Sequence, residues 1–285
     1  MKIARYLRTK GLLYMSANST QANKERSPLR FFLLCLLTIA GMFALSPILF
    51  DWGLHLIQVP VDRYAAIFPA LFLIAVWKSP RTKGQKDGYI FLTIAVFIAI
   101  VSIGGGFTRW GRLAIPLVAI GLIRISGATS LRKALLSFWL IPTPHFLETT
   151  FWPNLVLLYG KGAANFLPEL SLQETGMTLM ARGTRELSLN LHPADSGWAL
   201  AAALSGVAYF IGNQKNRTLM RTIASVAFYT IAALPLQALA ILAALLLMDT
   251  ERVVVAREWL NYFPLLAALV CLGFSYRSFS TQRES

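Results

Sequence analysis

The sequence predicts an all-α integral membrane protein with about eight transmembrane helices and a small outer-face β-hairpin. Of 285 residues, 56% are hydrophobic and 14% are charged, whereas an ordinary soluble domain has roughly 25% charged residues. Several apolar runs reach or approach the ~20 residues that span a hydrocarbon core. The 27 basic residues lie in short clusters between these runs, which is the positive-inside pattern of membrane proteins rather than a nucleic-acid-binding face.

The first half of the chain supplies four expected spans, at residues 31–50, 64–77, 89–107 and 113–125. Residues 1–30 precede them as a basic cytoplasmic segment. No convincing cleavage site follows the first apolar run, so we expect that run to remain as an anchor. Trp77 is typical of a membrane interface, and a basic loop follows it. The glycine triplet at 104–106 is interpreted as a turn, because no Lys-Ser or Lys-Thr helix start follows it.

The next part of the chain combines a broken helix with a polar insert. A fifth span starting near Ala134 should end at Pro142 and Pro144, because proline interrupts helices. Residues 151–167 are short and polar for a span, and we interpret them as an interfacial or re-entrant helix. Loose alternation at 177–180 and 187–191, around a turn at 181–184, predicts a hairpin outside the lipid.

Three further spans complete the predicted fold, at 198–212, 222–248 and 259–276. The first is rich in alanine and glycine, including Gly206, and such residues let helices pack closely. The second should be interrupted at Pro235 and Gln237. Most basic residues then fall on one side, which places both termini, with a tail at 277–285, in the cytoplasm. We therefore predict a multi-pass protein of the bacterial inner membrane whose membrane domain covers residues 31–276.

The strongest candidate site is the polar stretch at 192–197, on the expected outer face. His192, Asp195, Ser196 and Gly197 lie directly before the helix expected at 198. Asp195 has a simple role as the cap of that helix, and a functional alternative as a general base or substrate-orienting carboxylate beside His192. A Ser-His-Asp hydrolase is a further alternative, but three residues in one short turn rarely point at one another.

Three polar residues of the last two spans converge on the same expected face. Gln237 lies near the middle of its span, where a polar side chain is costly unless it finds an interhelical partner. Arg257 and Glu258 lie at the outer start of the last span, where charged residues are more often interface charges than catalysts. The candidate cleft therefore combines these three side chains with the stretch at 192–197.

Metal and cofactor chemistry are not expected. His55 and His145 lack the acidic or histidine partners that a metal site needs. Cys35 and Cys271 each lie inside an apolar run near opposite ends of the chain, which indicates neither a disulfide framework nor a metal motif.

Several short motifs occur in an informative order: Ile-Pro-Thr-Pro at 141–144, the outer hairpin at 176–191, and Ala194-Asp195-Ser196-Gly197 opening an alanine-rich helix. Over roughly residues 55–276 this order resembles the exosortase/archaeosortase family of polytopic membrane transpeptidases. In that family the tetrapeptide is Ala-Cys-Ser-Gly with cysteine as nucleophile. An Asn-x-x-Arg in the next helix supplies an arginine, and a histidine begins the last helix.

This chain departs from the family at all three positions. Asp195 stands in the place of the cysteine, Gln237-Ala238-Leu239-Ala240 replaces Asn-x-x-Arg, and Arg257 stands near the histidine. A carboxylate cannot form the thioester of a cysteine transpeptidase, and alanine cannot stabilise its oxyanion. The resemblance implies a divergent member with Asp195, Gln237 and Arg257 at the catalytic positions. His192, Ser196, Gly197 and Glu258 would contact the substrate.

The resemblance also implies a function and partners. An exosortase-like protein would process or bind the C-terminal sorting-signal helices of exported proteins on the outer face, in an envelope or exopolysaccharide system. Its expected partners are the lipid bilayer and such a transmembrane anchor, and not nucleic acid. Whether the chain is an enzyme stays open. Two alternatives are a non-catalytic membrane scaffold and a small-solute transporter, the latter motivated by Pro142, Pro235 and the buried Gln237.

Overall fold

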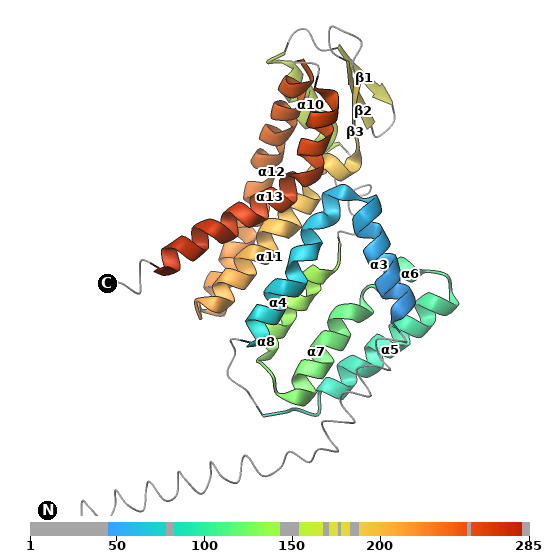
Figure 1. The fold of residues 1–285 in the computed structure, drawn as a ribbon, viewed down its shortest axis with the longest axis vertical. Coiled ribbons are helices and arrows are strands. Elements are labelled where there is room, and N and C mark those ends of the chain that lie inside the picture. Colours follow the sequence, from blue (N-terminus) through green and yellow to red (C-terminus); the bar gives the residue numbers. More distant parts are fainter. Residues whose placement is uncertain are drawn as a thin grey trace, which may run out of the picture. The chain divides into compact units, whose positions relative to one another are not determined.

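The computed structural model is mostly helical and contains one small antiparallel sheet (Figure 1). It describes residues 45–77, 83–142, 154–167, 171–175, 178–182, 188–249 and 252–280. The chain divides into two units, Met1–Ser46 and Pro47–Ser285, and the description below concerns the second. The basic segment at 1–30, Cys35, Pro144, His145 and most of the first expected span lie outside the described residues.

The first part of this unit consists of short helices. In chain order they are α3 (Ser46–Gln58), the 3-10 helix η1 (Pro60–Ile67), α4 (Phe68–Trp77), α5 (Gly88–Gly104), α6 (Thr108–Gly111), α7 (Ala114–Ser126), α8 (Leu131–Ala134) and the 3-10 helix η2 (Leu135–Leu140). Gly127 ends α7 in the left-handed conformation, with φ of 64°, which a glycine adopts without steric cost. An ion pair between Arg124 and Asp87 joins the end of α7 to the start of α5.

The second part carries the sheet and the longest helices. Its elements are α10 (Leu155–Ala164), β1 (Ser171–Thr175), β2 (Thr178–Arg182), β3 (Ser188–Leu191), the 3-10 helix η3 (Pro193–Ser196), α11 (Trp198–Gln214), α12 (Leu219–Asp249) and α13 (Val253–Ser280). Strands pair in the order β1-β2-β3, antiparallel throughout. The predicted hairpin is confirmed as β2 and β3, although Ala181 and Arg182 continue β2 rather than forming the turn. Strand β1 was not predicted.

Three helices of the described chain are long and apolar enough to cross a membrane: Pro60–Trp77, Leu219–Leu247 and Val253–Ser275. The predicted count of about eight spans is therefore not supported. Helices form at nearly every expected place, but α5 has 17 residues, α7 has 13 and α11 has 17. The fifth expected span is only α8 followed by η2. At 1.5 Å per residue a 13-residue helix covers about 20 Å, less than the ~30 Å hydrocarbon core.

Helix α12 continues through Pro235, where an interruption was predicted. Gln237, two residues later, also lies within the unbroken helix. Apolar helices tolerate an internal proline when neighbouring groups satisfy the freed carbonyl. This continuity removes one of the two broken helices that motivated the transporter alternative.

Helix α11 lies at the centre of the packing. Its Ala203 and Val207 belong to a core shared with Phe68 and with Leu136 of η2. Its other side packs against α12 and α13, and Figure 1 shows these three helices running beside one another. The helix following the candidate site is therefore held from both sides.

Gly206 allows the closest of these approaches. A Cβ atom at this position would lie 2.4 Å from both Phe68 Cζ and Trp139 Cδ1, so the predicted role of small residues in close packing is confirmed here. Gly206→Ala should lower the free energy of unfolding by about 1–3 kcal/mol, because overpacking forces two aromatic side chains to move. Thermal unfolding of the purified chain in detergent measures this, and an unchanged melting curve would contradict the packing described.

Large apolar side chains also cover the outside of the described helices. Phe97 on α5, Phe228 on α12 and Phe274 on α13 are 66%, 67% and 70% exposed. Many further leucine, isoleucine and valine side chains on these helices are also exposed. Together with the three long apolar helices, this surface suggests association with a membrane.

Candidate functional site

The sequence folds locally so that Asp195 is turned inward. β3 ends at Leu191, and His192 is extended, with φ of −107° and ψ of 164°. Pro193, at the first position of η3, fixes the backbone angle that a helix start needs. Gly197 then adopts φ of 94°, a conformation that L side chains rarely take. This sharp change of direction separates η3 from α11 and places Asp195 beneath the turn.

Asp195 caps η3 rather than α11. Its Oδ2 accepts a hydrogen bond of 2.9 Å from the His192 backbone N–H, and α11 begins at Gly197 without a side-chain cap. The predicted role of Asp195 as the cap of the helix that starts at Trp198 is therefore wrong, and its carboxylate instead accepts from the N-cap residue of the separate short helix η3. Capping of η3, however, does not explain why Arg257 and Gln237 also contact Asp195.

The structure brings Gln237 and Arg257 each into contact with Asp195. Arg257 Nη1 lies 2.8 Å from Asp195 Oδ2, and Gln237 Nε2 donates a hydrogen bond of 2.8 Å to the Asp195 backbone oxygen. Arg257 Nη1 also donates to the Asn190 oxygen at 3.4 Å. We call Asp195, Gln237 and Arg257 the polar node. It joins η3, α12 and α13, which are separated by up to 62 residues in sequence.

The polar node combines a buried charge with unpaired acceptors. Asp195 is 1% exposed and Gln237 is 3% exposed, whereas the Arg257 side chain is 30% exposed. Asp195 Oδ2 receives two donors, but Asp195 Oδ1, Ser196 Oγ and Gln237 Oε1 are buried without a hydrogen-bond partner. Buried polar atoms are nearly always paired, so these three atoms could receive donors from water or from a bound group.

The other predicted site residues behave differently from one another. Ser196 is fully buried next to the node, and Gly197 packs against the Gln237 side chain. His192 contributes its backbone N–H, while the residue as a whole is exposed. Glu258 is exposed on α13. Because Ser196 Oγ has no hydrogen-bond partner, the nucleophile-to-base contact that defines a Ser-His-Asp triad is not formed.

A second pair that includes a buried carboxylate, His55 and Asp62, was not predicted from the sequence. His55 Nε2 lies 2.7 Å from Asp62 Oδ2, and the Asp62 side chain is 3% exposed. The statement that His55 lacks an acidic partner was therefore wrong. The two residues are seven apart, but the junction between α3 and η1 turns the chain back and brings them together. Among the described residues there is still no group of three or more His, Cys, Asp or Glu side chains able to hold a metal ion.

Next to this pair, Arg63 links η1 to α13. Its guanidinium donates a hydrogen bond to the Tyr262 hydroxyl and lies 5.0 Å from the centre of the Tyr262 ring. Tyr262 is five residues after Arg257 on α13. Neither partner stands out in the sequence, because the contact joins residues 199 apart.

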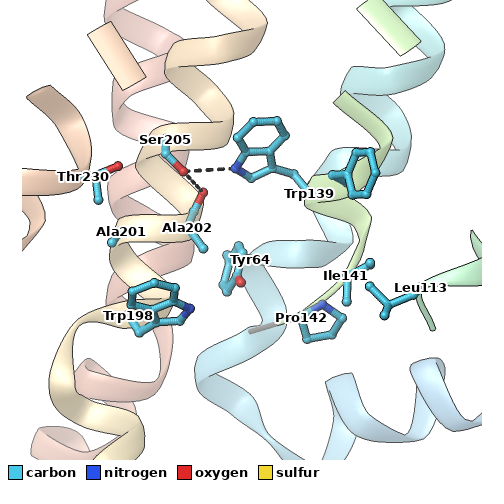
Figure 2. Close-up of a pocket in the computed structure, with 11 residues that line it drawn as sticks. Tyr64, Leu113, Trp139, Ile141, Pro142, Trp198, Ala201, Ala202, Ser205 and Thr230 are labelled. Atoms are coloured by element: carbon cyan, nitrogen blue, oxygen red, sulfur yellow. Dashed lines mark hydrogen bonds between the residues drawn. The ribbon is translucent and has the colours of Figure 1, made fainter. Parts of the chain in front are cut away.

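An apolar pocket lies along the first turns of α11. Its volume is about 350 Å³, and its lining consists of Tyr64, Leu113, Phe138, Trp139, Ile141, Pro142, Trp198, Ala201, Ala202, Ser205 and Thr230. Figure 2 shows Trp198 and Ala202 on one wall and Trp139, Ile141 and Pro142 on the other. Trp139 Nε1 donates to Ser205 Oγ at 3.0 Å, which leaves the rest of the lining mostly apolar. Trp198, which lines the pocket, follows Asp195 by three residues.

Comparisons with known proteins returned no relatives. No protein-family model matches the chain, no curated protein matches it, and no solved structure matches its fold.

Proposed function

We propose that the chain is an exosortase-like integral membrane protein of the bacterial inner membrane that binds the C-terminal anchor helices of exported proteins at its outer face. The observation that carries this proposal is the polar node. The resemblance aligned Asp195, Gln237 and Arg257 with three positions of the family site, and Asp195 is hydrogen-bonded to each of the other two at 2.8 Å.

Binding is favoured over cleavage by the chemistry of the node. A transpeptidase needs an activated nucleophile and donors aimed at a developing oxyanion. Asp195 Oδ2 is engaged by Arg257 and by the His192 N–H, and a carboxylate gives no thioester. Ser196 Oγ has no base as a partner. The node therefore suits the orientation of a bound segment, and the chain acts without the standard cysteine chemistry.

The apolar pocket, with a volume of about 350 Å³, provides a place for a few side chains of an anchor helix that packs against the outside of the protein. Its walls come from α11 and from η1 and η2, and Ala201, Ala202 and Ser205 are small enough to let another backbone approach. On the positive-inside topology both termini are cytoplasmic and Asp195 faces outward. A segment whose side chains enter the pocket from the bilayer would then present its outer end to the polar node, in an envelope or exopolysaccharide setting.

Photo-crosslinking in intact cells tests this proposal. A benzophenone amino acid at position 202 should form adducts with exported proteins that carry a C-terminal transmembrane anchor, and these proteins should be full length. The same group at Phe97, an exposed position on α5, is the control for random contact within the bilayer. The proposal fails if position 202 captures only lipid, or the same proteins as position 97.

The scaffold alternative is favoured by one specific observation. Arg257 contacts both Asn190 and Asp195, so the polar node also fastens β3 and η3 to α13 and has a structural role whether or not a ligand binds. A scaffold would yield, from position 202, constant adducts with resident membrane proteins that lack a C-terminal anchor. The identity of the captured proteins therefore separates the two functions.

A further inference from the structure

The apolar pocket follows one face of α11 over its first two turns. Its α11 wall consists of Trp198, Ala201, Ala202 and Ser205, and spacings of three and four residues put side chains on one face of a helix. At 1.5 Å per residue these positions cover about 10 Å along the helix axis. Trp198 is the first residue of α11, so the pocket extends inward from the end of α11 that adjoins the polar node.

Three polar side chains of the lining already have hydrogen-bond partners within the protein. Ser205 Oγ donates to the Ala202 oxygen at 2.9 Å and accepts from Trp139 Nε1 at 3.0 Å, as Figure 2 shows. Thr230 Oγ1 donates to the Val226 oxygen at 2.9 Å. The donors of these three side chains are therefore engaged, and a polar group that entered the pocket would leave its hydrogen bonds to water without replacing them. The pocket thus favours an apolar occupant.

The size and the aromatic lining of the pocket narrow the choice of occupant further. A cavity of about 150 Å³ holds one benzene molecule, so the volume of about 350 Å³ is enough for two ring-sized groups. The lining includes four aromatic residues, Tyr64, Phe138, Trp139 and Trp198, and aromatic rings pack favourably against one another edge-to-face or offset. Phe138 and Leu113 of the lining are themselves exposed, so side chains can enter from outside the protein.

We infer that the pocket selects anchor helices that carry two aromatic side chains one helical turn apart near their outer end. This inference rests on the proposed function, in which an anchor helix packs against the outside of the protein with its outer end at the polar node. Residues three or four apart are neighbours on a helix surface, whereas residues two apart are not, so only the first kind of pair can enter one pocket together. Because the pocket lies along the first two turns of α11, the pair lies within about two turns of the outer end of the anchor.

Synthetic anchor helices and the full chain in lipid nanodiscs test the inference. Two peptides of about 22 residues share one composition, with leucine along the inner part and alanine in the outer two turns except for two phenylalanines. The phenylalanines stand at i and i+4 in the first peptide and at i and i+2 in the second. Energy transfer from the tryptophans of the chain to a dansyl group at the outer end of the peptide measures binding. The first peptide should bind about tenfold more tightly, the contribution of one favourable aromatic contact.

A variant that fills the pocket decides whether the aromatic pair binds there. Ala202→Leu should remove the difference between the two peptides, while the melting temperature of the chain stays the same or rises, because the larger side chain gains contacts with the opposite wall. Ala224→Leu adds the same group at an exposed position of α12 and should keep the tenfold difference.

The outcomes separate this inference from the proposed function. If both peptides bind the wild type equally, or if Ala202→Leu keeps the difference, the inference is overturned while binding of anchor helices stands. A third peptide with leucines at i and i+4 tests the aromatic requirement, and binding as tight as that of the phenylalanine pair would overturn it. If none of the peptides binds, the inference and the proposed function are both overturned.

Discussion

Replacing Arg257 by methionine should lower the free energy of unfolding by about 3–5 kcal/mol, the range found when one partner of a buried ion pair is removed. The cost arises at the other residue. Asp195 is 1% exposed, and without Arg257 the Oδ2 of its carboxylate keeps, among the described residues, only the His192 N–H as a donor. A buried charge that has lost its counter-charge is far more costly than the pair was worth.

Removing the charge of the other partner, Asp195, should lower the free energy of unfolding by less. Asp195→Asn removes the charge but keeps an oxygen able to accept from the His192 N–H, and the 30% exposed Arg257 side chain can turn toward water. We expect a loss of about 1–2 kcal/mol, typical of a lost charged hydrogen bond. The double variant should be more stable than Arg257→Met alone. Unfolding of the four proteins in detergent forms a double-mutant cycle. Equal losses for the two single variants would contradict the burial and pairing described for Asp195.

The polar node was predictable from order in the sequence, whereas its contacts were not. Asp195 and Gln237 were selected because one opens an alanine-rich helix and the other is polar within an apolar run, and both signals are local. Which atoms meet depends on how η3, α12 and α13 pack. The Gln237 side chain bonds the Asp195 backbone oxygen and not its carboxylate, and no spacing in the sequence encodes that choice.

The wrong bounds of the predicted spans have a common physical cause. The apolar composition of a segment does not determine where its helix ends. The apolar run after Ala134 becomes the 3-10 helix η2, and the run before Gln237 continues unbroken through Pro235. Burial of apolar side chains stabilises a short 3-10 helix and a long continuous α-helix alike, because the hydrophobic effect has no direction. The His55–Asp62 pair was missed for a similar reason, because the corner between α3 and η1 is set by tertiary packing and not by a turn motif.

Gly197→Ala should lower the free energy of unfolding by about 2–4 kcal/mol, because it combines backbone strain with overpacking. Gly197 has φ of 94°, and a Cβ there would lie 2.9 Å from Gln237 Cβ and 3.0 Å from Gln237 Cγ. To relieve the contact, Gln237 must move away from the turn, and its hydrogen bond to the Asp195 oxygen would be lost. The substitution therefore acts on the polar node without altering any polar group.

Substitutions at three other glycines separate the cost of backbone strain from the cost of overpacking. Gly106 has φ of 71° with nothing within 4 Å of an added Cβ, so Gly106→Ala should show strain alone, about 1–2 kcal/mol. Gly206→Ala shows crowding without backbone strain, partly offset by the helix propensity that alanine adds within α11. Gly273 lies inside α13 with open space around it, and Gly273→Ala should stabilise the chain by about 0.5–1 kcal/mol through helix propensity. Unfolding of all four variants in one detergent gives the comparison. If Gly197→Ala costs no more than Gly106→Ala, then Gln237 does not pack against the turn and the node is looser than its distances indicate.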